Sequence, residues 1–186
     1  MTSDTPNADA SKTELAALIA DAALLRGTFT LRSGRTSSYY LDKYLFTTRP
    51  EVLTQLGAMF ADTIDSLPVK PDRLAGAELG GIPLVTVASM ATGIPCVFVR
   101  NAKKDYGTAK QTEGAINPGD TLVLLEDVAT SGGQAVEAVN TLRELGADVL
   151  AVIATIDREE GARENVDAAG VPFHALFTKS DLGIDE

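Results

Sequence analysis

The chain has 186 residues, of which 45% are hydrophobic, and a chain of this length buries about 70% of its unfolded surface around one core. Its 26 acidic residues outnumber its 16 basic residues and give a net charge of −10, which disfavours nucleic acid as a partner because phosphate contacts need an excess of Lys and Arg. Charges, Gly or Pro interrupt the apolar runs before the roughly 20 residues that a bilayer span requires, so no membrane segment is expected.

The N-terminal region predicts an amphipathic helix. Met1–Ala10 lacks the basic and apolar parts of a signal peptide, and we therefore expect the protein in the cytoplasm. Ser11 and Glu14 have the spacing of a capping box. Apolar residues then recur at helical intervals, so the predicted helix ends near Gly27.

A hairpin and a second helix are predicted next. Residues 28–32 and 38–42 are strand-like, and the turn residues 33–35 between them indicate a hairpin. With the first helix, this hairpin forms an appendage over residues 1–48 of a single domain that spans residues 1–186. A helix is expected to begin at Pro50, because proline suits the first helical turn.

The remaining sequence alternates between strands and helices. Its strands are continuous apolar runs, which is typical of a parallel sheet covered on both faces. We expect an α/β fold, with a doubly wound and mostly parallel sheet flanked by helices. The predicted segments are, in order, 74–77, 82–91, 96–100, 121–125, 133–145 and 149–156.

Cysteine and histidine occur once each. Cys96 and His174 therefore cannot form a disulfide, a thiolate metal cluster or a histidine dyad within the chain. We interpret both residues as structural.

The segment after residues 121–125 has the strongest functional pattern. Glu126 and Asp127 follow this predicted strand, and residues 130–133 read Thr-Ser-Gly-Gly before a helix. Open parallel sheets bind ligands beyond the carboxyl ends of their strands, where a helix N-terminus attracts an anion. The loop is therefore expected to bind a phosphate. Two carboxylates beside it suit sugar hydroxyls or a divalent ion, and we expect Asp127 at the rim of the site.

Simpler interpretations exist for the same pattern. A Gly-rich loop can merely turn the chain, and acidic residues can merely end a strand. The spacing does not match a Walker A motif, which needs Gly-Lys-Ser/Thr, or the Gly-x-Gly-x-x-Gly of dinucleotide-binding folds. The combination of acidic pair, hydroxyl residues and glycines in one segment favours a ligand site.

Residues 124–134, Leu-Leu-Glu-Asp-Val-Ala-Thr-Ser-Gly-Gly-Gln, resemble the phosphoribosyl pyrophosphate (PRPP) signature of type I phosphoribosyltransferases. In that family the acidic pair binds the ribose hydroxyls and the following loop binds the 5′-phosphate. The PRPP-binding residues that the resemblance implies are Arg100, Lys104, Tyr106, Glu126, Asp127, Val128, Ala129, Thr130, Ser131, Gly132, Gly133 and Gln134.

Further segments resemble the orotate phosphoribosyltransferase branch of that family. Residues 29–34 and 38–40 resemble its N-terminal hood over the base. Residues 77–84 resemble its pyrophosphate loop, where glycines let backbone N–H groups approach a diphosphate. Taken alone, this segment is better interpreted as an ordinary turn from strand to helix. The loop residues implied are Glu78, Leu79, Gly80 and Gly81.

Residues 100–114 resemble the mobile catalytic loop of the same branch. Four basic residues in this segment bring positive charge to an acidic chain that must bind two anions, although a charge run is commonly just a solvated face. Lys104 is the implied catalytic residue, which stabilises the departing pyrophosphate. The segment departs from the family where Asn101 replaces a common Lys and Tyr106 a common His, which leaves those two roles open.

Residues 156–161, Ile-Asp-Arg-Glu-Glu-Gly, resemble the segment whose Arg binds the orotate carboxylate. The resemblance therefore implies that Arg158, together with Thr130, binds orotate. A guanidinium suits this role because it can hold a carboxylate through two parallel hydrogen bonds. The alternative is a surface Arg that caps the next helix.

The resemblance implies an enzyme that joins N1 of orotate to C1′ of PRPP and releases pyrophosphate, giving orotidine 5′-monophosphate for pyrimidine (UMP) synthesis. It also implies Mg²⁺ held mainly by PRPP, with no protein ligand assigned, and a homodimer whose catalytic loop serves the neighbouring subunit. Two alternatives stay open. A purine phosphoribosyltransferase would not need a carboxylate-binding Arg158, and a non-catalytic regulator would bind PRPP only as a signal.

The excess of acidic residues is also what a salt-rich cytoplasm favours, and it suggests a halophilic archaeal source. We expect a higher unfolding midpoint in molar KCl than in dilute buffer. Thermal unfolding at the two salt concentrations tests this, because equal midpoints contradict salt adaptation.

Overall fold

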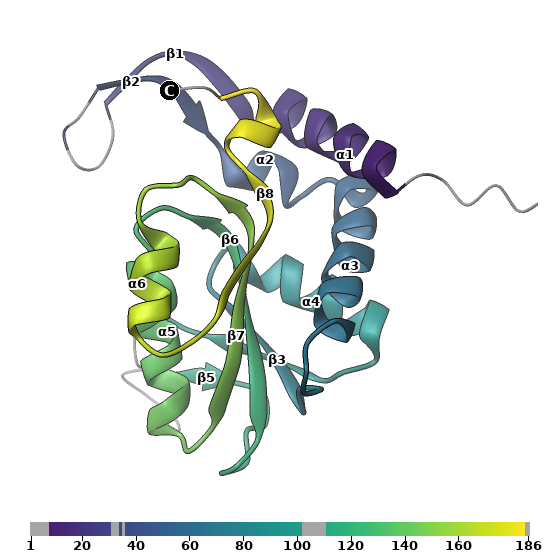
Figure 1. The fold of residues 1–186 in the computed structure, drawn as a ribbon, viewed down its shortest axis with the longest axis vertical. Coiled ribbons are helices and arrows are strands. Elements are labelled where there is room, and N and C mark those ends of the chain that lie inside the picture. The colour runs from purple at the N-terminus through teal and green to yellow at the C-terminus, as the bar shows by residue number, and fades with distance from the viewer. Residues whose placement is uncertain (1–7, 31–33, 35, 102–110, 185–186) are drawn as a thin grey trace, which may run out of the picture.

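The computed structural model describes residues 8–30, 34, 36–101 and 111–184. These residues form a six-stranded sheet between two layers of helices, with a hairpin beyond one end of the sheet (Figure 1). No helix in these ranges is both long enough and apolar enough to cross a membrane.

The sheet has the strand order β5-β4-β3-β6-β7-β8. All neighbouring pairs are parallel except β4 and β5, which are antiparallel. The expected doubly wound, mostly parallel α/β fold is therefore confirmed. The strands are β3 (Arg73–Ala77), β4 (Cys96–Val99), β5 (Thr112–Glu113), β6 (Thr121–Ala129), β7 (Asp148–Asp157) and β8 (Phe173–Thr178).

Two pairs of helices cover the two faces of the sheet (Figure 1). Helices α3 (Pro50–Asp65) and α4 (Gly81–Thr92) share one apolar cluster with the first face. Helices α5 (Gly133–Glu144) and α6 (Ala162–Ala168) share a second cluster with the other face. The helix predicted to begin at Pro50 is confirmed, whereas α6, β5 and β8 were not predicted.

The N-terminal appendage differs from its prediction at both ends of the helix. Helix α1 (Ala8–Ala23) begins before Ser11, so Ser11 lies inside the helix instead of capping it. The helix ends before Gly27 because the chain continues as strand β1 (Leu24–Thr30), which pairs antiparallel with β2 (Thr36–Leu41). Pairing with β2 thus overrides the helical spacing of the last apolar residues. The predicted hairpin is confirmed.

Two short helical segments complete the appendage. Helix α2 (Lys43–Phe46) follows β2, and the 3₁₀ helix η1 (Ser180–Leu182) lies against α1. Leu182 and Ile184 belong to the same apolar cluster as α1, so the C-terminal segment helps to hold the appendage on the core.

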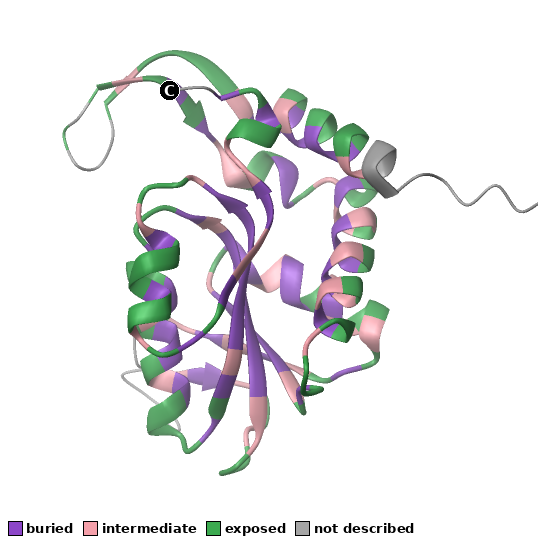
Figure 2. Cartoon of the chain, viewed as in Figure 1, coloured by how far each residue is buried: buried purple, intermediate pink, exposed green. Residues whose placement is uncertain are grey.

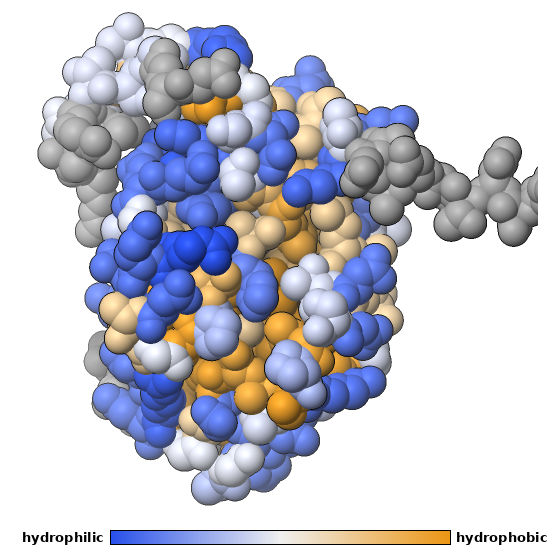
Figure 3. All heavy atoms as spheres, in the orientation of Figure 1, coloured by the Kyte–Doolittle hydropathy of each residue, from blue (hydrophilic) through white to orange (hydrophobic). Residues whose placement is uncertain are grey.

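The buried and exposed surfaces follow these layers. Figure 2 shows buried residues along the central strands and exposed residues on the outer sides of α5 and α6. In Figure 3 hydrophilic residues dominate over α5 and α6, while hydrophobic residues gather lower in the middle of the same face. The parallel strands all end at one edge of the sheet, which is where the predicted site residues that the structure describes lie.

Candidate active site

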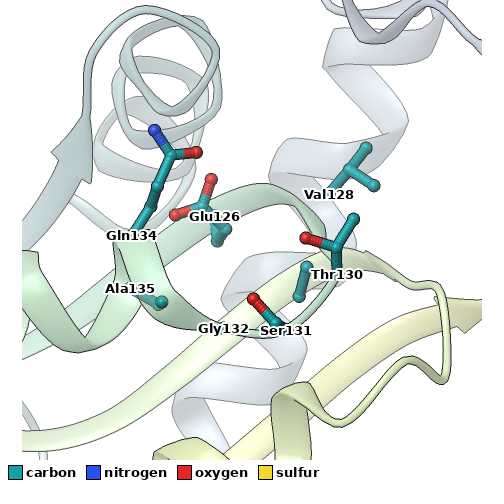
Figure 4. A pocket seen from close by; sticks show the side chains of 9 residues that line it. Glu126, Val128, Thr130, Ser131, Gly132, Gln134 and Ala135 are labelled. Carbon is teal, nitrogen blue, oxygen red and sulfur yellow. The ribbon is translucent and has the colours of Figure 1, made fainter. Parts of the chain in front are cut away.

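The loop after β6 forms a pocket at the N-terminus of α5 (Figure 4). The pocket measures about 60 Å³ and is lined by Glu126 and by residues 128–135. The first N–H groups of α5 have no partner inside the helix, and together with the helix dipole they favour an anion. The predicted phosphate loop therefore has the geometry of an anion site.

Glycine is required at the turn into α5. Gly132 has φ +75°, in the left-handed region that side chains disfavour. A Cβ atom there would lie only 3.1 Å from the carbonyl oxygen of Ala162. The turn leaves the Thr130 and Ser131 side chains exposed beside the pocket (Figure 4).

The acidic pair is buried, so the expectation that Asp127 lies at the rim was wrong. Glu126 is 6% exposed and Asp127 is 1% exposed. Strand β6 runs on to Ala129, beyond its predicted end, and pairs with β7 up to that residue. Glu126 lines the loop pocket, but Asp127 is not one of its lining residues.

The environment of Glu126 favours its neutral form. Burial and the neighbouring Asp127 charge raise the pKa of Glu126 to about 8. One oxygen, Oε1, accepts a hydrogen bond from the Asp127 N–H at 3.3 Å. The other, Oε2, is buried without a hydrogen-bond partner among the described residues. A hydroxyl group in the pocket would satisfy this oxygen, because a hydroxyl can accept from the protonated carboxyl or donate to the ionised one.

This pKa predicts a stability that falls as pH rises. Between the ordinary glutamate pKa of 4.5 and about 8, folded Glu126 keeps a proton that the unfolded chain has released. Its contribution is thus fully present below 4.5 and is lost as pH rises through about 8, at up to about 1.4 kcal/mol per pH unit. Urea unfolding of wild type and Glu126→Gln between pH 5 and 8 measures this. A stability difference that does not change with pH would contradict it.

Asp127 lies between the hood and the predicted pyrophosphate loop. Its Oδ1 accepts a hydrogen bond from the Val128 N–H at 2.6 Å. The Lys43 ammonium lies 2.9 Å from Oδ2. A Cβ atom on Gly80 would overlap the Asp127 carboxylate, so the carboxylate packs directly against the backbone of this loop. The hood and the predicted pyrophosphate loop, which are far apart in the sequence, thus meet at Asp127.

The predicted pyrophosphate loop connects β3 to α4. The Glu78 N–H donates to the Val99 carbonyl at 2.8 Å, and its carboxylate accepts from the Asn101 N–H at 2.8 Å. Leu79 is 62% exposed, and Gly81 begins α4. Asn101, whose role the sequence left open, therefore fastens the loop to the end of β4.

A second pocket adjoins the phosphate loop. Arg100 and Asn101 line it together with Gln134, which also lines the first pocket. The Arg100 guanidinium lies 3.8 Å from the Glu113 carboxylate. Arg100 is thus brought close to the loop. The other two residues predicted on this segment, Lys104 and Tyr106, lie outside the described residues.

Arg158 lies at the end of β7, next to the phosphate loop. Its N–H donates to the Ala129 carbonyl at 2.9 Å. Its guanidinium donates to the Tyr39 hydroxyl at 2.9 Å and lies 5.2 Å from the centre of the Tyr39 ring. It also pairs with Glu160 at 2.9 Å. The hood thereby orients the guanidinium that is predicted to bind the carboxylate.

Sequence reasoning missed three contributors to the site. Lys43 contacts the acidic pair, while Tyr39 and Glu160 contact Arg158. Lys43 lies in a short helix without periodicity and far from Asp127 in the sequence, so no local pattern indicated it. Tyr39 was placed in the hood, but its partner depends on how the hood packs.

The anion loop, the acidic pair and the covering hood define the class of the protein. Residues 46–172 match the family described as phosphoribosyl transferase domain, and the expected resemblance to that family is confirmed.

More specific relatives identify the branch. The chain is 44% identical over 181 residues to the orotate phosphoribosyltransferase of Haloquadratum walsbyi, covering 97% of both chains. It is 46% identical over 168 residues to that of Halobacterium salinarum, covering 90% of this chain and 94% of the relative. The chain belongs to the orotate phosphoribosyltransferase family.

Solved structures agree with this assignment. The orotate phosphoribosyltransferase of Mycobacterium tuberculosis in complex with PRPP aligns with a TM-score of 0.80 and 28% identity, covering 94% of this chain and 99% of that chain. The adenine phosphoribosyltransferase of Leishmania donovani aligns with a TM-score of 0.69 at 19% identity, which shows a shared fold alone.

Proposed function

We propose that the chain transfers the ribose 5-phosphate of PRPP to N1 of orotate, releasing pyrophosphate and forming orotidine 5′-monophosphate for pyrimidine synthesis. The observation that carries this proposal is the position of Arg158. The Arg158 N–H donates to the Ala129 carbonyl next to the phosphate loop, and its guanidinium donates to the Tyr39 hydroxyl. Such a group suits a base with a carboxylate.

The residues divide between two subsites. The loop from Thr130 to Gln134 binds the 5′-phosphate, and Glu126 forms a hydrogen bond with a ribose hydroxyl in the same pocket. The loop from Glu78 to Gly81 is assigned to the diphosphate, and its Gly80 packs against Asp127 near the end of β6. No protein nucleophile is needed, since the barrier lies in charge separation at C1′ and is lowered by positioning and by positive charge on the diphosphate.

Magnesium enters with the donor in this proposal. The Asp127 carboxylate is already paired, because Oδ1 accepts from the Val128 N–H and Oδ2 lies 2.9 Å from the Lys43 ammonium. This arrangement fits an ion bound mainly by diphosphate oxygens, which Mg²⁺ prefers when it retains several waters. When bound, the ion neutralises charge on the leaving diphosphate.

The remaining part of the proposal concerns a second subunit. We propose a homodimer in which the loop that carries Lys104 and Tyr106 serves the neighbouring site. One exposed apolar side chain beside the site supports an interface there, namely Leu79, which is 62% exposed. The cytoplasmic location stays a prediction.

One substrate panel tests the function against its rivals. Purified protein is given PRPP and Mg²⁺ with orotate, adenine or hypoxanthine, at low and high KCl. We expect consumption of orotate alone. Turnover of a purine would favour the purine enzyme, and PRPP binding without turnover of any base would favour the regulator.

A further inference from the structure

Lys43 connects the hood to the buried acidic pair. It is the first residue of α2, and its ammonium lies 2.9 Å from Oδ2 and 3.1 Å from Oδ1 of Asp127. The Asp127 side chain is 1% exposed, whereas that of Lys43 is 31% exposed. The ion pair thus reaches from the buried end of β6 toward solvent.

The charges around this ammonium keep it protonated. Burial lowers the pKa of Lys43, but the charges of Asp127 and Glu126 outweigh burial, so the pKa is raised above its ordinary value of 10.5. Tyr44, on the same helix, acts in the same direction. The cation therefore persists wherever the enzyme is folded near neutral pH.

The backbone that carries Lys43 is well anchored. Asp42 caps α2 by accepting a hydrogen bond from the Tyr44 N–H at 3.1 Å. The Thr47 hydroxyl donates to the Lys43 carbonyl at 3.0 Å. A few residues earlier, Tyr39 of β2 contacts Arg158. One short segment thus contacts both Asp127 of the predicted PRPP site and Arg158 of the predicted orotate site.

We propose that Lys43 is a positioning residue of the PRPP site, which holds the Asp127 carboxylate against the pyrophosphate loop at Gly80. The inference rests on the proposed function. The diphosphate of the donor must approach Gly80, where an unpaired Asp127 carboxylate would repel it. The fixed ammonium offsets that charge and keeps the carboxylate in one orientation before the donor arrives.

The first test separates donor affinity from base affinity. Lys43→Met removes the charge but keeps much of the length and apolar stem of the side chain. We expect the KM for PRPP to rise about 10- to 100-fold, as for the loss of a charged hydrogen bond, with the KM for orotate nearly unchanged. Lys43→Arg should recover most of the donor affinity because it restores the charge.

A matched control is available for the loss of one positive charge. Lys70 is exposed and precedes β3, at the opposite end of the strands from the site. Lys70→Met should leave both KM values unchanged. Equal rises in both KM values for Lys43→Met, or failure of Lys43→Arg to recover affinity, would mean that Lys43 has only a structural role.

The second test asks whether Lys43 acts through Asp127. PRPP binding is measured by calorimetry for Asp127→Asn, with and without Lys43→Met. Because the double variant leaves no unpaired buried charge, it is the form to use if Lys43→Met alone does not fold. We expect little further loss in the double variant, since coupled residues are not additive. A further loss of tenfold or more would overturn the proposal.

Direct measurement of PRPP binding also distinguishes a failure of the proposed function from a failure of the proposed role of Lys43. Wild-type protein that binds PRPP without converting orotate would overturn the proposed function, while the calorimetric comparison would still decide the role of Lys43.

Discussion

Arg158→Ala is expected to lower kcat/KM for orotate by at least about 30-fold. Removing one partner of a buried charge pair costs about 2–5 kcal/mol, because the other charge is left without its partner. The Arg158 side chain is only 14% exposed, so water cannot readily replace it. Most of the effect should appear in the KM for orotate, with the KM for PRPP changed little.

Comparison with a base that lacks the carboxylate isolates this contact. Uracil is orotate without that group, so its poor turnover should be nearly the same in wild type and Arg158→Ala. Arg143→Ala is a suitable control. Arg143 lies at the end of α5 that is far from the site, and its guanidinium donates to the backbone carbonyls of Ala169 and Gly170. Equal losses for orotate and uracil would make Arg158 a structural residue that only supports Tyr39.

Lys104→Ala is expected to lower turnover by about 10²- to 10³-fold, while the KM for orotate changes little. Removing one preorganised charge that stabilises a transition state typically costs about 3–4 kcal/mol. The expectation rests on the family resemblance, which assigns Lys104 to the departing pyrophosphate. Steady-state kinetics with both substrates varied measures the turnover. An unchanged kcat would mean that Lys104 does not take part in catalysis.

Mixing two inactive variants tests the shared site. A dimer of one Lys104→Ala chain and one Arg158→Ala chain contains one site with intact Arg158 and an intact Lys104 from its partner. Random exchange of equal amounts should therefore restore about a quarter of wild-type activity, because half the dimers are mixed and each has one complete site. Verified mixed dimers without activity would mean that the loop serves its own chain.

Local pattern was sufficient for the central part of the fold. The apolar runs predicted the parallel strands β3, β6 and β7, and Pro50 predicted the start of α3. Strand β8 and helix α6 were not predicted, because short elements contain too few residues for a clear period. The helical spacing at the end of α1 was misleading, since Leu24 is held in a strand by pairing with Leu41.

The sequence by itself determined the anion loop. A strand, two glycines and a following helix are local features, and they expose the first N–H groups of the helix to an anion whatever surrounds them. It also determined the family, through motifs whose residue types suit phosphate, ribose and carboxylate. Tertiary structure alone decided that the acidic pair is buried and that Lys43 and Tyr39 support the two subsites. Those contacts join Lys43 to Asp127, 84 positions apart, and Tyr39 to Arg158, 119 positions apart. Burial also raises the pKa of Glu126, which no local pattern contains.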